Sequence, residues 1–347
     1  MDSISQAALG AALGGVVAGR VYGRAAIIGG AALATLPDLD VVISYGTAIA
    51  NYTYHRGFSH SLLVLVPVAI ILALLLSRRF PDLSRRRWLT FTLLILVTHP
   101  LLDTLTTYGT QLFWPLLPPL GTNSIFIIDP LYTLPLLVTI VIGLLRPPAI
   151  GALAAGLTIS TLYLGWALTA QQVVSQRMAP VLAEEGLSGA PTMIQPMPFN
   201  TVLWRVTVIA EDQRLETAVS VFDGLQPPVI ERFAYRRDLL NALTEFPEGR
   251  RLIWFTGEFL DVHIVANELR ATDIRLGVPS AHPFTFVLAE RAGPGAQWHP
   301  VTSRQSPRPS IRSEAAGALF QRLSGRAPVL CLSNLATSTF EAGCPGS

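Results

Sequence analysis

Lysine is absent from this chain of 347 residues, and all 25 basic residues are arginine. A Schiff-base lysine and the lysine of a phosphate-binding P-loop are therefore excluded. Cysteine is scarce as well. Cys331 and Cys344 are too few for a zinc ribbon, although they can pair in an oxidising compartment. The first six residues lack the positive region of a signal peptide, so we expect the first apolar segment to be retained.

Charged residues make up only 14% of the chain, against about 25% in a typical soluble domain. The deficit is confined to residues 1–170, which hold nine Arg and six Asp or Glu, whereas residues 171–347 hold sixteen Arg and seventeen Asp or Glu. We therefore predict an α-helical multi-pass membrane domain followed by a small α+β soluble domain. With a net charge of +2 and no basic patch interleaved with aromatics, we expect membrane lipids and not nucleic acid as partners.

Four apolar runs are each near the ~20 residues that cross a bilayer; they span 61–77, 88–106, about 131–146 and about 149–170. Two earlier segments, 4–19 and 25–36, are rich in Gly and Ala and are separated by Arg20 and Arg24. Small residues let membrane helices pack closely. These segments therefore predict a tight helical hairpin with a short second arm.

Arginine is distributed unevenly between the predicted loops. If both hairpin arms cross, eight arginines lie on one side, in loops 20–24, 78–87 and 146–148. The opposite loops hold one, Arg56, within 37–60 and 107–130. Because arginine-rich loops stay in the cytoplasm, we predict a bacterial inner-membrane protein with an extracytoplasmic C-terminal domain. That location favours a Cys331–Cys344 disulfide.

The C-terminal half has the pattern of a small α+β domain with an antiparallel sheet. We expect a polar helix at about 171–187 and then a Pro-rich link at 191–198. Runs rich in β-branched and aromatic residues predict strands at 201–209, 215–222, 251–257, 263–271 and 284–290. Helices are expected near 228–246 and 311–324, and a loose Pro-, Ser- and Gly-rich stretch at 292–310.

The first candidate motif is LPDLD at residues 36–40. In extended chain, residues two apart point the same way, so Asp38 and Asp40 could present both carboxylates to one ligand. A capping or turn role is the alternative.

The second motif, HRGFSHS at 55–61, places His55 and His60 around a turn at Gly57, just before an apolar run. Ser59 is expected to cap the helix that follows. Incidental histidines in an interfacial loop are the alternative.

The third motif, HPLLD at 99–103, places His99 and Asp103 four residues apart, on one face of a helix. Both lie inside an apolar run, where ionisable groups are costly and usually functional. A buried His–Asp hydrogen bond or a proton relay is the alternative.

All three motifs fall at the outer end of the predicted membrane domain. Three imidazoles and three carboxylates suit one or two first-row metal ions, Zn²⁺ or Mn²⁺; the candidate ligands are Asp38, Asp40, His55, His60, His99 and Asp103. The stretch 108–115 fits an interfacial aromatic belt or a substrate contact. Asp129 fits an N-cap before Pro130, or a further ligand.

Together these motifs resemble those of the YdjM-like family of inner-membrane metal-dependent hydrolases. The resemblance covers about residues 1–145 and rests on LPDLD at 36–40, HRGFSHS at 55–61, HPLLDTLTTYGTQLFWP at 99–115 and IFIIDPLYTLP at 125–135. It implies metal ligation by the same six residues and a distant kinship with zinc-dependent phospholipase C and nuclease enzymes. Many members carry a His near position 6, where this chain has Gln6. The C-terminal domain resembles an extension found in longer members.

Three functions are compatible with these motifs. The first is a metal-dependent hydrolase in which Asp38 or Asp103 acts as general base on a phosphoester of a lipid or lipid-linked molecule at the outer membrane face. A transporter or metal-handling membrane protein could use the same cluster, although the inner halves of the predicted helices offer no further His, Asp or Glu for a proton relay. The third is a non-enzymatic scaffold whose soluble domain carries the function.

Overall fold

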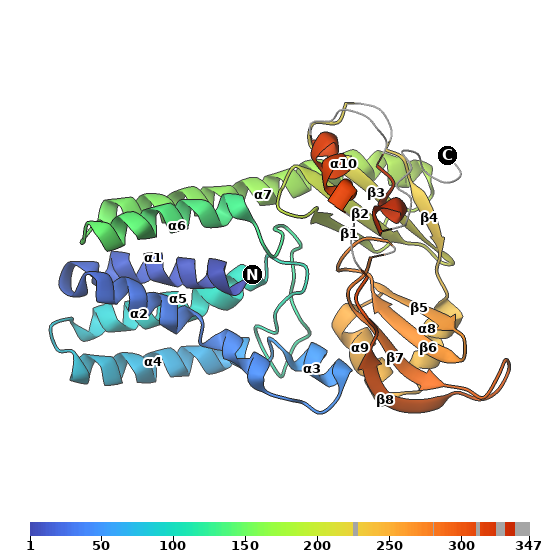
Figure 1. The fold of residues 1–347 in the computed structure, drawn as a ribbon, viewed down its shortest axis with the longest axis horizontal. Coiled ribbons are helices and arrows are strands. Elements are labelled where there is room, and N and C mark those ends of the chain that lie inside the picture. Colours follow the sequence, from blue (N-terminus) through green and yellow to red (C-terminus); the bar gives the residue numbers. More distant parts are fainter. Residues whose placement is uncertain (225–227, 280, 310–312, 324–329, 337–347) are drawn as a thin grey trace. The chain divides into compact units, whose positions relative to one another are not determined.

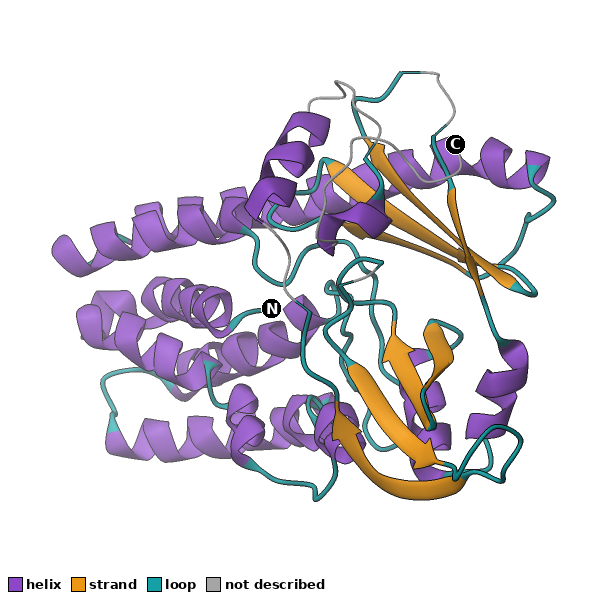
Figure 2. Ribbon diagram, turned by 45° about the vertical axis from the view of Figure 1, so that its right-hand side comes forward, coloured by secondary structure: helices purple, strands orange, loops and turns teal. Residues whose placement is uncertain are grey.

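The computed structural model describes residues 1–224, 228–279, 281–309, 313–323 and 330–336. The chain divides into two compact units. Unit 1 comprises Met1–Ile43, Tyr54–Thr169 and Pro198–Asn200, and unit 2 comprises Ser44–Thr53, Ala170–Met197 and Thr201–Ser347. The two four-stranded sheets that the structure describes both belong to unit 2 (Figure 2).

Unit 1 is helical, as its apolar runs predict. Its helices are α1 (Ser3–Tyr22), α2 (Arg24–Ala34), α4 (Leu62–Arg79), α5 (Arg85–Asp103), α6 (Pro130–Leu145) and the first part of α7 (Ile150–Glu184). They lie side by side, with the N-terminus at one end of the bundle (Figure 1). By length and apolar composition, α1, α4 and α7 could each cross a bilayer, while α2 and α6 are apolar but shorter.

The predicted hairpin of α1 and α2 is confirmed, including its short second arm. Glycine allows the two backbones to touch. A Cβ atom added at Gly30 would lie only 2.2 Å from the carbonyl oxygen of Gly10 and 3.1 Å from the Cα of Gly14. The Gly- and Ala-rich composition of this segment is therefore explained by close helix packing.

Polar side chains cap the N-termini of two helices of unit 1. Asp129 accepts hydrogen bonds from the amides of Leu131 and Tyr132, so its predicted role as an N-cap is confirmed. The predicted N-cap at Ser59 is wrong, because Ser61 caps α4 by accepting from the amide of Leu63. The three-residue 3₁₀-helix η2 (Phe58–His60) precedes α4 and includes Ser59, which is left for another role.

The LPDLD motif is not extended, as we expected, but forms the 3₁₀-helix η1 (Pro37–Val42). Pro37 stands at the first helical position, where its fixed φ suits a helix start. Since a 3₁₀-helix has three residues per turn, side chains two positions apart differ in direction by about 120°. Asp38 and Asp40 therefore point to different neighbours.

Unit 2 contains two antiparallel sheets in simple up-and-down order, which confirms the predicted α+β class. The first sheet has strands β1 (Thr192–Pro196), β2 (Leu203–Ile209), β3 (Gln213–Ser220) and β4 (Glu231–Ala234). The second has β5 (Leu260–Val265), β6 (Glu268–Asp273), β7 (Thr285–Glu290) and β8 (His299–Gln305). The C-terminal part of α7 packs on the first sheet through Ala170, Val174 and Met178.

Several predicted elements of unit 2 are corrected. The expected strand at 251–257 lies in helix α9 (Pro247–Thr256), whose buried Leu252, Phe255 and Thr256 have helical spacing. The polar helix at 171–187 is a continuation of α7, the Pro-rich link contains β1, and the loose stretch 292–310 contains β8. Other helices of unit 2 are α8 (Arg237–Leu243), α10 (Ser313–Leu323) and η3 (Leu332–Ala336).

Cys344 lies outside the described residues, so the Cys331–Cys344 disulfide stays a prediction.

The segment Ser44–Thr53 belongs to unit 2 although unit 1 precedes and follows it in the chain. It includes most of α3 (Ala48–Tyr54). The Ile49 amide donates to Ser303 Oγ (3.1 Å), and the Tyr52 hydroxyl donates to Asp273 Oδ2 (2.8 Å). Ile49 and Tyr52 are both buried, so this segment is an integral part of the core of unit 2.

Candidate metal centre

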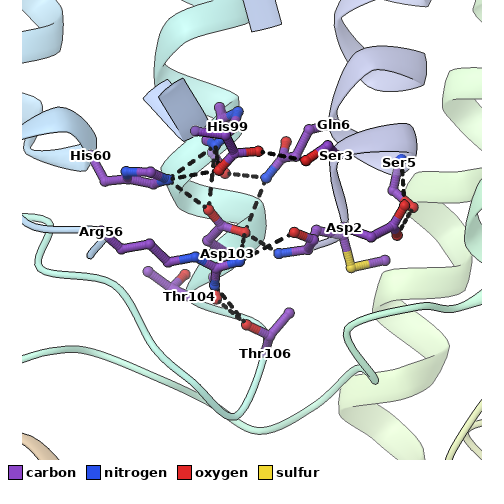
Figure 3. A network of polar contacts seen from close by, with 12 residues as sticks. Asp2, Ser3, Ser5, Gln6, Arg56, His60, His99, Asp103, Thr104 and Thr106 are labelled. Carbon is purple, nitrogen blue, oxygen red and sulfur yellow. Dashed lines mark hydrogen bonds and ion pairs between the residues drawn. The ribbon is translucent and has the colours of Figure 1, made fainter. Parts of the chain in front are cut away.

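Four side chains from three separate elements meet at one end of unit 1. Asp38 comes from η1, His60 from η2, and His99 and Asp103 from the last turn of α5. One ligand atom from each residue lies within 4.8 Å of the other three. Figure 3 shows His60 and His99 converging on Asp103, with Arg56 and Gln6 beside them. No other group of this kind occurs among the residues that the structure describes.

Five of the six separations between these ligand atoms match those of a tetrahedral zinc site, and the sixth, between Asp38 and Asp103, is at most 4.8 Å. His60 Nε2 lies 3.2 Å from His99 Nε2. Each of these nitrogens lies 3.4 Å from Asp38 Oδ1 and 3.3–3.4 Å from Asp103 Oδ2. Ligands at about 2.05 Å from a tetrahedral zinc are about 3.3 Å apart. The four atoms therefore surround a space of the size that a zinc ion needs.

The hydrogen bonds of the two imidazoles fix which nitrogens face this space. His99 Nδ1 donates to the carbonyl oxygen of Ala34 over 2.6 Å. His60 Nδ1 lies 2.9 Å from Ser59 Oγ, whose own proton goes to Asp40 Oδ2 at 2.8 Å. With both Nδ1 atoms protonated, both Nε2 atoms present lone pairs. Two lone pairs 3.2 Å apart repel each other unless a proton or a metal ion lies between them.

Asp103 supplies the second argument for a cation. Its side chain is fully buried, and its Oδ1 atom contacts Gln6 Nε2 (3.1 Å), Arg56 Nη2 (3.3 Å) and the Met1 amino group. Its Oδ2 atom, which faces the two histidines, lies 3.3 and 3.4 Å from their Nε2 atoms and forms no regular hydrogen bond among the described residues. A buried carboxylate oxygen without a full hydrogen bond is costly. A metal ion or a protonated imidazole would provide the missing interaction.

Asp40 and His55, the other two predicted ligands, are not part of this group. His55 Nδ1 lies 2.9 Å from Asp40 Oδ1, while Asp40 Oδ2 accepts from Ser59 and from the Arg56 amide. Burial alone would raise the pKa of Asp40, but these hydrogen bonds lower it, so the carboxyl is an anion. Asp40 orients His60 through Ser59, the kind of support that commonly fixes a metal-binding imidazole.

Arg56 is the site residue that sequence reasoning missed. Its side chain is buried, with Nη1 donating to Thr106 Oγ1 (3.4 Å) and the guanidinium 5.3 Å from the centre of the Tyr108 ring. Its backbone has a φ of +58°, an unusual conformation for a bulky residue. The sequence did single it out in one respect, because Arg56 is the one arginine in the predicted outer loops.

The segment that follows α5 holds the HRGFSHS turn in place. The Gln111 amide donates to the Arg56 carbonyl (3.2 Å), and the Leu62 amide donates to the Leu112 carbonyl (2.8 Å). Tyr108 is buried against Arg56 and His55, so its role in the structure is packing beside the site. Asp129 is occupied by its cap and by the Tyr163 hydroxyl (2.9 Å) and is not one of the four.

The fold and the site together define a helical, apolar protein with a buried His/Asp cluster that can hold a metal ion. The chain belongs to the YdjM inner membrane protein family, which matches residues 1–174. This family membership and the apolar helices support a membrane location. The resemblance found in the sequence motifs is thus confirmed.

Two curated relatives match about a third of the chain. The Inner membrane protein YbcI of Escherichia coli is 35% identical over 112 residues, which cover 32% of this chain and 64% of the relative. The Uncharacterized protein YfhP of Bacillus subtilis is 30% identical over 122 residues, which cover 33% of this chain and 37% of the relative. The chain therefore spans less than two thirds of either relative. No solved structure matches it.

Proposed function

We propose that unit 1 is a membrane-embedded, zinc-dependent hydrolase that cleaves a phosphoester in a lipid or lipid-linked substrate. The observation that carries this proposal is the buried cluster of Asp38, His60, His99 and Asp103, whose ligand atoms lie within 4.8 Å of one another around a space that two imidazole nitrogens and two carboxylate oxygens face. When bound, a zinc ion supplies Lewis-acid polarisation and activation of water.

Asp38 is the residue of the four that a substrate can reach. Its side chain is 16% exposed, whereas those of His60, His99 and Asp103 are 0% exposed. Catalytic zinc sites have three protein ligands and one open position. With His60, His99 and Asp103 as the three ligands, the partly exposed Asp38 would stand beside the open position. Of the two predicted general bases, Asp38 therefore fits better, since both oxygens of Asp103 are directed into buried contacts or toward the centre.

Arg56 would attract the phosphate group. A guanidinium pairs with phosphate oxygens and stays charged at any physiological pH. In this chain it already neutralises Asp103 at 3.3 Å and is held rigidly by Thr106 and Tyr108. A fixed cation costs no reorganisation when negative charge develops on the substrate.

We expect the purified protein to hydrolyse p-nitrophenyl phosphodiesters and phospholipids in a metal-dependent manner. Chelation should abolish the activity and Zn²⁺ or Mn²⁺ should restore it. Asp38→Asn should lower kcat by roughly 10²–10⁴-fold, the usual contribution of a general base, while His299→Ala, an exposed position in unit 2, should have no effect. A protein that binds metal tightly yet hydrolyses no phosphoester would instead favour the metal-handling alternative.

We also propose that the α4–α5 loop is cytoplasmic and that unit 2 is extracytoplasmic. The support is the arginine asymmetry of eight residues against one. Alkaline phosphatase fused after residue 347 should be active, and the same reporter fused after Asp82 should be inactive. Fluorescent-protein fusions at the two positions should give the opposite pattern. Cytoplasmic reporter activity at the C-terminal fusion would refute this topology.

A further inference from the structure

A cavity of about 510 Å³ lies between the α1–α2 hairpin and the α4–α5 pair. Pockets that bind small molecules usually measure about 300–1,000 Å³. On the hairpin side its wall is made mainly of small residues of α2, namely Ala25, Ala26, Gly29 and Ala32. On the other side it is made of Leu72 and Leu76 of α4 and Trp88 and Phe91 of α5. We call it the α2 groove.

The α2 groove is open at the surface of unit 1. Ala25, Gly29 and Ala32 are exposed, and a Cβ atom added at Gly29 would meet no other atom within 4 Å. The residues beside the groove are also exposed and apolar, including Ile28 (62%) and Leu75 (53%). An open groove in an apolar surface of this kind accepts a hydrocarbon ligand and not a polar one.

One end of the α2 groove is lined by a residue that lies two positions before a candidate metal ligand in the chain. Leu36 lines the groove and is followed by Pro37 and then by the ligand Asp38. Ala34, the last residue of α2, accepts the hydrogen bond that orients His99. The opposite end is lined by Tyr22, Phe80 and Trp88, next to the arginine-rich loops. The same helix thus forms both the wall of the groove and a support of the metal site.

The dimensions of the α2 groove favour a single lipid chain. The eleven residues of α2 extend over about 16 Å, close to the ~15 Å that one leaflet contributes to the hydrocarbon core. An additional helix is about 10 Å wide, so it would lie mostly outside a groove of this size. A single hydrocarbon chain is the better fit.

We propose that the α2 groove binds one hydrocarbon chain of a lipid whose phosphate group lies at the metal centre. This inference rests on the proposed function and narrows its substrate to a membrane lipid phosphoester that is positioned by its tail. The chain would lie along α2, with the headgroup end at Leu36 and the tail directed toward Tyr22.

Photolabelling tests this assignment without depending on catalysis. The full-length protein is reconstituted into phosphatidylcholine vesicles that contain phosphatidic acid with a diazirine in one acyl chain. After irradiation, peptides are mapped by mass spectrometry. Adducts are expected on groove residues such as Leu72 and Phe91. Gly29→Phe, which fills the groove, should lower this labelling by roughly tenfold. Ile28→Phe adds the same ring beside the groove and should leave labelling unchanged.

The variants must be folded for this comparison, so their thermal midpoints are measured in parallel. Ala32→Phe is the second groove-filling variant, since Ala32 also lines the groove and is exposed. Equal labelling in wild type, Gly29→Phe and Ala32→Phe, or adducts spread evenly over the lipid-facing residues, would overturn the assignment. Labelling that depends on the groove in a protein without hydrolase activity would refute the proposed reaction and leave the lipid site standing.

Hydrolysis assays on two substrates test whether the α2 groove takes part in substrate binding when the metal centre is an active hydrolase. In Gly29→Phe, turnover of long-chain phosphatidic acid should fall, while turnover of a water-soluble p-nitrophenyl phosphodiester should match the wild type. If both substrates are turned over at wild-type rates, the metal centre is a hydrolase and the α2 groove has no part in substrate binding.

Discussion

Metal content is expected to fall from about one ion per chain to background when His99 and Asp103 are both replaced by alanine. The double variant keeps only Asp38 and His60, and two ligands do not retain zinc against dialysis. The variant also leaves the buried Arg56 guanidinium and the Met1 amino group without their carboxylate, so we expect a lower thermal midpoint with the helical fold retained. Inductively coupled plasma mass spectrometry on dialysed protein measures the loss, and circular dichroism measures the fold.

A graded series makes this prediction specific to the site. Asp40→Asn should still bind the ion but with roughly 10–100-fold lower affinity, the usual effect of losing a residue that orients a ligand. His299→Ala should bind as the wild type does, because His299 is exposed in unit 2. Full metal content in the double variant would show that the four side chains do not form the binding site, and the proposed hydrolase would then fail with it.

Gly30→Ala should destabilise the protein far more than Gly29→Ala, although the two glycines are neighbours on α2. The new Cβ at position 30 would lie 2.2 Å from a backbone oxygen of α1, so the two helices must separate. Overpacking of this kind typically costs about 1–3 kcal/mol. The Cβ at position 29 meets nothing within 4 Å, and alanine favours a helix over glycine.

Thermal unfolding of detergent-solubilised protein, followed by tryptophan fluorescence, compares the two variants. Separation of α1 from α2 would also displace Gln6 and the Ala34 carbonyl, which contact Asp103 and His99. Gly30→Ala should therefore bind metal more weakly as well. Equal thermal midpoints for the two variants would show that the hairpin is not packed as closely as the structure indicates.

Local patterns were sufficient to predict the helices and part of the site. Apolar runs of near bilayer length predicted α4, α5 and α6, because a long apolar helix leaves a clear signature in one sequence. The spacing of four between His99 and Asp103 predicted a shared face, and their side chains lie 3.4 Å apart. Such relations depend on helix geometry alone and need no knowledge of the tertiary structure.

Other features depended on contacts that no local pattern contains. The LPDLD motif could be extended or 3₁₀, and that choice decides whether Asp40 faces Asp38 or His55. The stretch 251–257 has strand-like composition, but the burial of Leu252 and Phe255 selects a helix. Arg56 is recognised only when Asp103, Thr106 and Tyr108 are brought around it from a separate part of the chain.

The ten residues Ser44–Thr53 limit how this protein can be recombined with its relatives. They lie within the part that matches the YdjM family, yet their partners Asp273 and Ser303 lie beyond it. A hybrid that joins unit 2 to another family member at residue 174 would leave these partners without their segment. The exchangeable module is therefore the whole of unit 2, which is discontinuous in the chain. It includes the segment Ser44–Thr53, which lies between the LPDLD and HRGFSHS motifs that supply the metal centre.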